Sequence, residues 1–266
     1  MSSRSLLVYR VRNLGDMIQT AALSRLLPRA AGVFRHRLDE ASEERLLVVN
    51  GVLHKERPPT EGATCLFAGV SGPYWRHKEY ADWLGRSPYP IGGRDQYTVD
   101  AARLNGHDAV LIGCATMTFP RYEGDRSGVY SVDYSGPGTS LTHWISRHKT
   151  VPMQWSMAMQ QLSQYRTAEA VYTSRLHVAL PCLAYGTPVF IANPHRAWKP
   201  ERFSVIEELG IPYDRLVTAD LSEYSERYIE FLESTLNITI EPDTPKMPEV
   251  SDPPAGILSR LFRRSK

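Results

Sequence analysis

The chain has 266 residues, of which 42% are hydrophobic and 23% are charged, and these values are ordinary for a globular protein with a buried core. Its 31 Lys and Arg residues nearly balance its 29 Asp and Glu residues. The resulting net charge of +2 does not favour a nucleic-acid-binding protein, which would carry a clustered basic face.

The cysteines and the N-terminal segment indicate a cellular compartment. The three cysteines lie far apart without metal-ligand spacing, which favours buried thiols in a reducing compartment over disulfides or a zinc site. The first apolar stretch is too short and too interrupted for a signal peptide or a membrane span. We therefore expect a cytoplasmic protein.

Strand and helix patterns alternate through the first half of the chain. A buried strand is predicted at 5–11, followed by a Gly-bearing turn and a helix at 17–27. Asp16, with Gln19 three residues later, has the form of an N-cap with a capping box. Further strands are predicted at 46–49, 64–70 and 109–113, helices at 79–84 and 96–105, and a Gly-bearing turn at 91–95.

The second half repeats the alternation, which indicates an α/β architecture with parallel sheets. Strands are predicted at 129–133, 170–173 and 188–192, and a turn at 134–139. Helices are predicted at 153–164 and 222–236, and a further helix begins after the strand that ends at Thr173. The chain then becomes Pro-rich and acidic, which predicts a linker or a disordered tail over residues 239–266. Its basic end, 256–266, is either a solubilising tail or a segment that touches an anionic membrane.

The segment Thr173-Ser-Arg-Leu-His177 places two polar side chains where a strand should turn into a helix. With Ser174 as the predicted N-cap, Arg175 and His177 fall in the first helical turn, where free N–H groups attract anions. A guanidinium adds a bidentate grip on a carboxylate or phosphate. Pro181 cannot donate to the carbonyl of His177, which predicts a distorted helix start. The alternative is a surface arginine beside a packing histidine.

Four segments resemble, in the same order, the motifs of the polysaccharide pyruvyl transferase family. The most specific is TSRLHVALPCLAYGTPVFI, which resembles the family's strand, Arg-Leu-His, helix and Gly-x-Pro-Val pattern. The other three are NLGDMIQTAAL, GGRDQYTVDAARLNGHDAVLIGCATMTF and PERFSVIEELGIP. Each of the shorter motifs alone is a weak signal, whereas the four in order, over about residues 5–220, are specific to the family.

The resemblance implies a GT-B-like fold with two Rossmann-like domains facing a cleft. We place the acceptor-side domain at 1–134, the donor-side domain at 135–238 and the tail at 239–266. The implied reaction moves the enolpyruvyl group of phosphoenolpyruvate onto a sugar diol of a polysaccharide or its precursor, forming a pyruvate ketal and releasing phosphate. It implies no cofactor and no metal. The acceptor is either free or lipid-linked, and a lipid-linked acceptor would place the protein at the inner face of the membrane. The chain is short for the family, and its acceptor-binding parts are the least constrained.

The resemblance also implies roles for individual residues. By position, the donor-binding set of the family corresponds to Arg94, Arg175, Leu176 and His177. His177 is the candidate proton donor, because the imidazole ordinarily titrates near neutral pH.

Three further positions have a functional and a structural interpretation. Asn13 and Asp16 follow the first strand, where Asp16 is either the general base for an acceptor hydroxyl or only a helix cap. Arg202 either lines the cleft or pairs with a glutamate of its own helix. Asp95 either pairs with its neighbour in sequence or caps the next helix. Trp144 could stack on a sugar or serve in packing.

Two other classes of function remain open from the sequence. A GT-B glycosyltransferase would need a carboxylate for the ribose of a nucleotide-sugar donor, and Glu207 and Glu208 are available for it. A non-catalytic relative would serve as a binding subunit, although the intact Arg94, Arg175 and His177 argue against such a loss of function.

Overall fold

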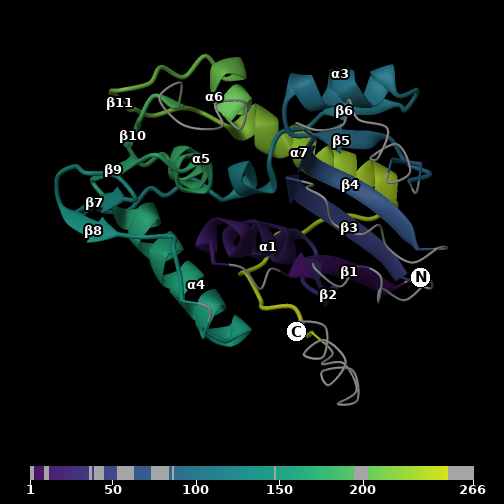
Figure 1. Ribbon diagram of the computed structural model, residues 1–266, viewed down its shortest axis with the longest axis horizontal. Helices are drawn as coiled ribbons and strands as arrows, with labels where there is room; N and C mark the ends of the chain where they lie inside the picture. The colour runs from purple at the N-terminus through teal and green to yellow at the C-terminus, as the bar shows by residue number, and fades with distance from the viewer. Residues whose placement is uncertain are drawn as a thin grey trace, which may run out of the picture.

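The computed structural model contains two sheets flanked by helices (Figure 1). The structure describes residues 3–8, 12–35, 38, 45–52, 63–72, 84–85, 87–146, 148–194 and 203–250. Most of the predicted helix at 79–84, the predicted cleft residue Arg202 and the basic segment 256–266 lie outside these ranges.

The first sheet has six strands in the order β2-β1-β3-β4-β5-β6, and every neighbouring pair is parallel. Its strands are β1 (Ser3–Val8), β2 (Ala31–Phe34), β3 (Arg45–Val52), β4 (Thr64–Ser71), β5 (Ile91–Gly93) and β6 (Ala109–Leu111). From β1 the chain passes to β2 on one side and then crosses to β3 on the other side of β1. The topological switch point, where open α/β sheets bind ligands, therefore lies between β1 and β3.

The second sheet repeats this plan in the order β11-β10-β9-β7-β8. Its strands are β7 (Val129–Val132), β8 (Thr139–Leu141), β9 (Ala170–Thr173), β10 (Val189–Ile191) and β11 (Leu216–Val217). All pairs are parallel except β10 with β11. The switch point lies between β7 and β9, and the loops after these two strands meet there.

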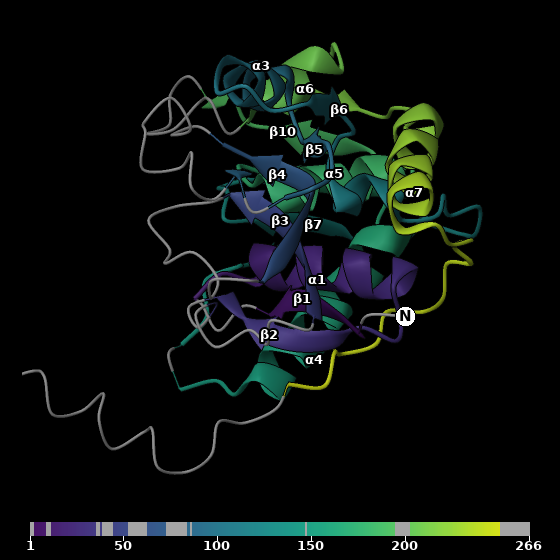
Figure 2. The ribbon, with the colours of Figure 1, turned by 90° about the vertical axis from the view of Figure 1, so that its right-hand side faces the viewer.

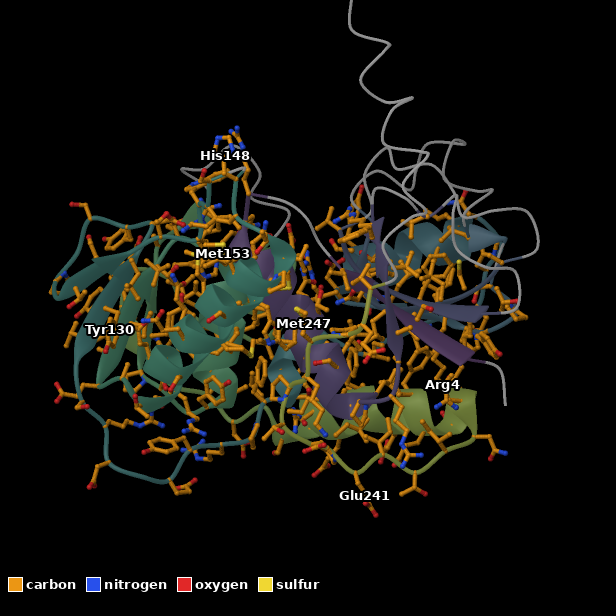
Figure 3. All side chains as sticks on the ribbon, turned by 90° about the horizontal axis from the view of Figure 1, so that it is seen from below. Arg4, Tyr130, His148, Met153, Glu241 and Met247 are labelled. Carbon is orange, nitrogen blue, oxygen red and sulfur yellow. The ribbon has the colours of Figure 1, made fainter. Side chains whose placement is uncertain are left out.

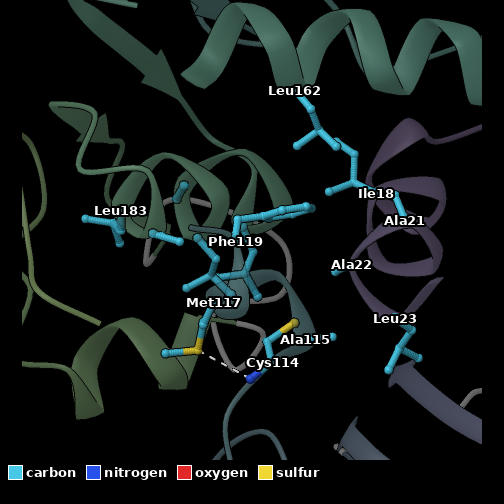
Figure 4. Packing of buried hydrophobic residues seen from close by; sticks show 14 of the residues in the cluster. Ile18, Ala21, Ala22, Leu23, Cys114, Ala115, Met117, Phe119, Leu162 and Leu183 are labelled. Carbon is cyan, nitrogen blue, oxygen red and sulfur yellow. Dashed lines mark hydrogen bonds between the residues drawn. The ribbon is translucent and has the colours of Figure 1, made fainter. Parts of the chain in front are cut away.

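The two sheets share one hydrophobic core, which contains Leu66 of β4 and Val171 of β9. The described helices are α1 (Leu14–Leu26), α3 (Gln96–Leu104), α4 (Val151–Thr167), α5 (Leu176–Ala184), α6 (Ser204–Glu208) and α7 (Ser222–Leu236), with a 3-10 turn η3 (Ala115–Thr118). Figure 4 shows Phe119, just after η3, among Ile18 of α1, Leu162 of α4 and Leu183 of α5. Figure 3 shows Tyr130 of β7 and Arg4 of β1 on opposite sides of the molecule.

Helix α7 returns the chain to the first sheet after the second sheet is complete (Figures 1 and 2). Its Tyr228 is buried and donates a hydrogen bond of 2.9 Å to the main-chain oxygen of Ala68 in β4. The α/β class predicted from the sequence is confirmed. The GT-B-like arrangement with a domain boundary at residue 134 stays a prediction. Two elements cross that boundary: β7 precedes residue 134 but belongs to the second sheet, and α7 follows it but packs on the first.

The expected disorder from residue 239 onward does not hold for residues 239–250. Figure 3 shows this segment running from Glu241 past Met247 along the body of the protein. The main-chain N–H of Asp243 donates to the oxygen of Arg25 at 2.9 Å, and that of Gly32 in β2 donates to the oxygen of Glu249 at 2.7 Å. Prolines reduce the freedom of an extended segment and do not prevent it from pairing at a sheet edge.

The predicted turn at 91–95 is instead strand β5 followed by a bend. Gly92 is needed there for close packing, because a Cβ at this position would collide with the Ile112 side chain and lie 2.9 Å from the main-chain oxygen of Phe67. The short strands β2, β8 and β11 were not predicted. Within the described ranges, none of the helices has the length and apolar character needed to cross a bilayer.

Candidate active site

The N-terminus of α5 lies at the carboxyl end of β9, and its cap differs from the predicted one. The N-cap residue is Arg175, in extended conformation, and its side chain makes no capping hydrogen bond. Ser174, the predicted cap, donates its hydroxyl to the main-chain oxygen of Asp133 at 2.9 Å instead. The N–H of Arg175 donates to the hydroxyl of Thr173, also at 2.9 Å. Ser174 is therefore used to join the loops after β7 and β9.

The start of α5 is distorted at His177, as predicted from Pro181. His177 has φ −83° and ψ 18°, outside the helical region, and the helix is kinked there. Leu176, the first residue of α5, has its side chain buried in the shared core. The two residues that flank Leu176 are only partly buried, so the helix start is anchored at Leu176 and partly exposed at the position on either side of it.

The side chain of Arg175 is held on two sides. Its Nε donates to the carboxylate of Asp133 at 2.9 Å, and its guanidinium lies over the indole of Trp144, 4.7 Å from the ring centroid. The Arg175 side chain is 26% exposed, whereas Trp144 is 59% exposed. Within the described part of the chain, its two terminal nitrogens have no hydrogen-bond acceptor. They are the donors that a bound carboxylate or phosphate would use.

Asp133, which the sequence analysis missed, organises this region. It follows β7 and adopts φ 47°, a left-handed conformation that is uncommon for residues other than glycine. Besides Arg175, its carboxylate accepts from the hydroxyl of Thr142 at 2.6 Å and from the N–H of His143 at 3.1 Å. A charged residue directly after a buried parallel strand was the signal that could have identified it.

The N-terminus of α1 reaches the same region from the first sheet. The N-cap is Asn13, whose side-chain oxygen accepts from the N–H of Gly15 at 3.1 Å. Asn13 also forms an isolated antiparallel bridge with Trp144, and the N–H of Leu14 donates to the oxygen of His143 at 2.9 Å. The start of α1 is thus attached to the loop that carries Trp144.

The prediction that Asp16 is the N-cap was wrong, because the cap lies at Asn13. Asp16 lies in the first turn of α1 and is partly exposed. Its carboxylate accepts weak hydrogen bonds from the side-chain amides of Gln19 at 3.4 Å and Asn13 at 3.5 Å. Asp16 is therefore not committed to capping, and a carboxylate in this place could accept a proton from a bound hydroxyl.

Helices α1 and α5 meet with little space between them. A Cβ on Gly15 would lie 3.2 Å from the Cβ of His177 and 3.3 Å from its Nδ1. The structure thus brings Asn13 and the first turn of α1 to His177, with Arg175 held on Trp144 beside them. Because these groups come from both sheets, the site lies where the two sheets meet.

Arg94 has different surroundings. It follows β5 and is 1% exposed, with its Nε 3.5 Å from the carboxylate of Asp95. Asp95 is the N-cap of α3, where it accepts from the N–H of Thr98 at 2.9 Å, so both predicted alternatives for Asp95 are correct. A ligand could contact the Arg94 guanidinium only after its neighbours move. The donor-binding role of Arg94 therefore stays a prediction.

Glu208 of α6 lies close to Arg94. Its carboxylate accepts from the N–H of Gln96 at 2.7 Å, at the start of α3. Burial raises the pKa of Glu208, while the hydrogen bond from Gln96 acts in the opposite direction. Glu208 therefore joins α6 to α3. This contact gives it a structural role in place of the ribose-binding role considered from the sequence.

His143 is a buried structural residue behind the site. Its Nε2 is 3.0 Å from the hydroxyl of Tyr165, which donates to Gln161 at 2.6 Å. Burial lowers the pKa of His143 to about 3, although the negative charge of Asp133 acts to raise it. His143 is therefore neutral at physiological pH.

In the part of the chain that the structure describes, no group of three or more His, Cys, Asp and Glu residues is arranged to hold a metal ion.

Comparison with known proteins gives a family and a fold. Residues 13–196 match the family model described as polysaccharide pyruvyl transferase. This range includes Asn13, Asp16, Arg94, Arg175 and His177. No curated protein matches significantly.

Among solved structures, the chain resembles a functionally uncharacterised protein from Klebsiella pneumoniae, with a TM-score of 0.51 and 14% sequence identity. The match covers 78% of this chain and 88% of that chain. At this identity, the likeness concerns the fold alone.

Proposed function

This chain belongs to the polysaccharide pyruvyl transferase family, and from that premise we propose that it transfers the pyruvyl unit of phosphoenolpyruvate onto a sugar diol. The observation that carries the proposal is the Arg175 guanidinium, which is fixed through Nε and offers two terminal nitrogens beside His177. Phosphoenolpyruvate carries a carboxylate and a phosphate close together, and a planar guanidinium matches either group bidentately.

The chemistry requires an acid next to an anion-binding group. Carbon C3 of phosphoenolpyruvate takes a proton, which makes C2 electrophilic. One sugar hydroxyl then adds to C2, phosphate leaves, and the second hydroxyl closes the ketal. Of the two hydroxyl protons, one replaces the proton used at C3 and the other leaves on the phosphate. We assign the proton donation to His177, at the partly exposed start of α5.

The acceptor side is assigned to the first turn of α1. Asp16 is the candidate base for the attacking hydroxyl, because it lies partly exposed in the first turn of α1, at the helix end that approaches His177. Asn13 would position the same sugar, since it lies at the start of α1 and pairs with Trp144. The acceptor is a free saccharide or a lipid-linked one.

We also assign donor contacts to Leu176 and Arg94, and a place in the cleft to Arg202. Leu176 would contribute its main-chain N–H at the start of α5, where helical N–H groups favour anions. Arg94 would contribute only after it becomes accessible. The proposed domains remain 1–134 for the acceptor and 135–238 for the donor, with Arg94 as the donor contact that the first domain would contribute.

A thermal-shift experiment tests the donor. Phosphoenolpyruvate at about 100 times its dissociation constant should stabilise the native protein by about 2.7 kcal/mol and raise the melting temperature by several degrees. Arg175→Ala should abolish the shift. A clear shift with a nucleotide sugar and none with phosphoenolpyruvate would contradict the proposal and favour a glycosyltransferase. Phosphate release in the presence of diol-bearing sugars then identifies the acceptor.

A further inference from the structure

The guanidinium of Arg175 is fixed by two groups to which sequence analysis gave no such role. Asp133 binds one edge at Nε, and Trp144 lies under one face. We propose that Asp133 and Trp144 are positioning residues that orient Arg175, so that its two terminal nitrogens receive an oxyanion group of the donor together. The inference rests on the proposed function, because it assumes that Arg175 binds the donor.

Asp133 fixes the edge of the guanidinium. A carboxylate at Nε leaves the opposite edge, formed by the two terminal nitrogens, for the ligand. Asp133 cannot easily turn away, because the Thr142 hydroxyl and the His143 N–H also donate to its carboxylate. Its left-handed backbone conformation at φ 47° is uncommon and directs a charged side chain across the β7–β9 switch point.

Trp144 fixes the plane of the guanidinium. Planar guanidinium groups stack favourably on indole rings, and the distance of 4.7 Å to the ring centroid is within the range of that interaction. With the edge bound to Asp133 and the face on Trp144, the long side chain keeps little rotational freedom. The conformational entropy of this side chain is therefore lost on folding, and donor binding does not have to bear that cost.

The same short segment supports both groups and connects them to the acceptor side. Thr142 and His143 donate to Asp133, and Trp144 follows directly. The oxygen of His143 accepts from Leu14, and Asn13 bridges to Trp144, so the segment is attached to the start of α1. The orientation of Arg175 is therefore linked to the position of the helix to which we assign the acceptor.

The test uses conservative variants of the full chain. Asp133→Asn preserves the side-chain shape and tolerates positive φ, but removes the charge and one acceptor. We expect its dissociation constant for phosphoenolpyruvate to rise about tenfold, with the KM for the acceptor changed less than twofold. Trp144→Leu should raise the dissociation constant about fivefold, and Trp144→Phe should recover most of the loss, since it keeps an aromatic face.

A matched control comes from an exposed ion pair outside the site. Arg121 and Glu123 are 3.1 Å apart and are 56% and 80% exposed. Glu123→Gln removes a charge of the same sign from an arginine partner and should leave the dissociation constant unchanged. Melting temperatures of all variants identify any change that arises from unfolding.

A double-mutant cycle separates positioning from general structural damage. Arg175→Lys retains a charge but has no Nε and no planar fork. In this background Asp133→Asn and Trp144→Leu should produce no further loss of donor binding. If their losses are instead fully additive with that of Arg175→Lys, the proposed positioning is overturned.

Fluorescence provides a measurement without a ligand, so that failure of the inference can be distinguished from failure of the proposed function. The emission of Trp144 is obtained by subtracting the spectrum of Trp144→Phe from that of the wild type. It should change in Asp133→Asn, because the guanidinium leaves the indole. An unchanged Trp144 emission overturns the positioning role, even in a protein that binds phosphoenolpyruvate normally. Absence of phosphoenolpyruvate binding by the wild type overturns the proposed function instead.

Discussion

Arg94 and Arg175 occupy similar places in the two sheets but differ in their surroundings. Each follows a parallel strand, β5 or β9, and each has an aspartate partner. Arg94 is 1% exposed and its Asp95 also caps α3. Arg175 is 26% exposed, lies on an indole ring and has two terminal nitrogens without a protein acceptor among the described residues.

The difference shows that strand position alone does not determine whether the guanidinium of an arginine is accessible to a ligand. Asp95 is the residue next to Arg94 in sequence and is buried together with it, so the two charges are paired inside the protein. Asp133 comes from another strand, β7, and holds Arg175 by one edge only. An arginine held across a switch point can present its remaining donors to a ligand directly, whereas one enclosed with its partner can do so only after its neighbours move.

The largest expected effect concerns the residue that follows each arginine by two positions. This residue is His177 after Arg175 and Gln96 after Arg94, so His177→Gln makes the first region resemble the second. Loss of a general acid should lower turnover about 10²- to 10⁴-fold while phosphoenolpyruvate still produces its thermal shift. Steady-state kinetics measure the loss, and near wild-type turnover in this variant would contradict the acid role.

The next prediction concerns stability. Arg94→Ala leaves the buried Asp95 without its cationic neighbour and should lower the free energy of unfolding by about 3 kcal/mol or more. Arg175→Ala removes a partly exposed pair and should cost about 1 kcal/mol or less, because solvent screens the charges. Urea unfolding measures both changes.

The volume of the Arg94 side chain needs its own control. Arg94→Met keeps most of the volume and should recover part of the stability, if packing contributes to the loss. The opposite result would be an Arg94→Ala protein that is as stable as the wild type but does not bind phosphoenolpyruvate. In that case Arg94 would be a donor ligand, as the resemblance implies.

The sequence predicted most of the long elements because their patterns are local. Strand β9 and helix α7 have the predicted boundaries, and α3 begins after its predicted cap at Asp95. Strand β8 was missed because only residues 133–138 separate it from β7, to which it is parallel, whereas parallel neighbours normally need a crossover of a dozen or more residues. A connection this short lacks the helical crossover by which a parallel neighbour is usually recognised in a sequence.

The candidate site could be located from the sequence where its residues are close together. Arg175 and His177 were singled out because both lie in one motif. Asp133 and the enclosure of Arg94 depend on contacts between strands and helices that are far apart in the chain. Hydrophobic periodicity indicates which face of an element is buried, but it does not indicate which side chain of another element will lie against it.

The Arg175 region also has a titratable group that should make stability depend on pH. His143 has a pKa of about 3 in the folded protein, mainly because it is buried, and an ordinary value of 6.5 when unfolded. The unfolded state therefore binds more protons between these values, so stability is complete above pH 6.5 and falls as the pH is lowered towards 3. This group alone contributes about 1.4 kcal/mol per pH unit in that window.

Unfolding measured between pH 7 and pH 5 tests this dependence. His143→Gln, which can still bond to Tyr165, should reduce the slope, whereas Arg94→Ala should retain it. The groups with which the His143 side chain interacts are Asp133, Arg175 and Tyr165. An equal slope in wild type and His143→Gln would show that other groups determine the pH dependence.

The smallest expected effect comes from the close approach of α1 to α5 near Arg175. Ala is a better helix former than Gly by roughly 0.5–1 kcal/mol, so Gly15→Ala in the first turn of α1 should raise stability if space permits. The added Cβ would lie 3.2 Å from the Cβ of His177, which must then move by a few tenths of an ångström.

Since a misplacement of about 1 Å can cost about 10²-fold in rate, this smaller shift should lower turnover about fivefold. Because the displacement of His177 offsets the gain in helix propensity, stability should stay nearly unchanged, and so should donor binding. In the His177→Gln background the same substitution should have no further effect on turnover, because the displaced acid is already absent. A Gly15→Ala protein with full wild-type turnover would show that His177 tolerates displacement, and that the contact between α1 and α5 serves packing alone.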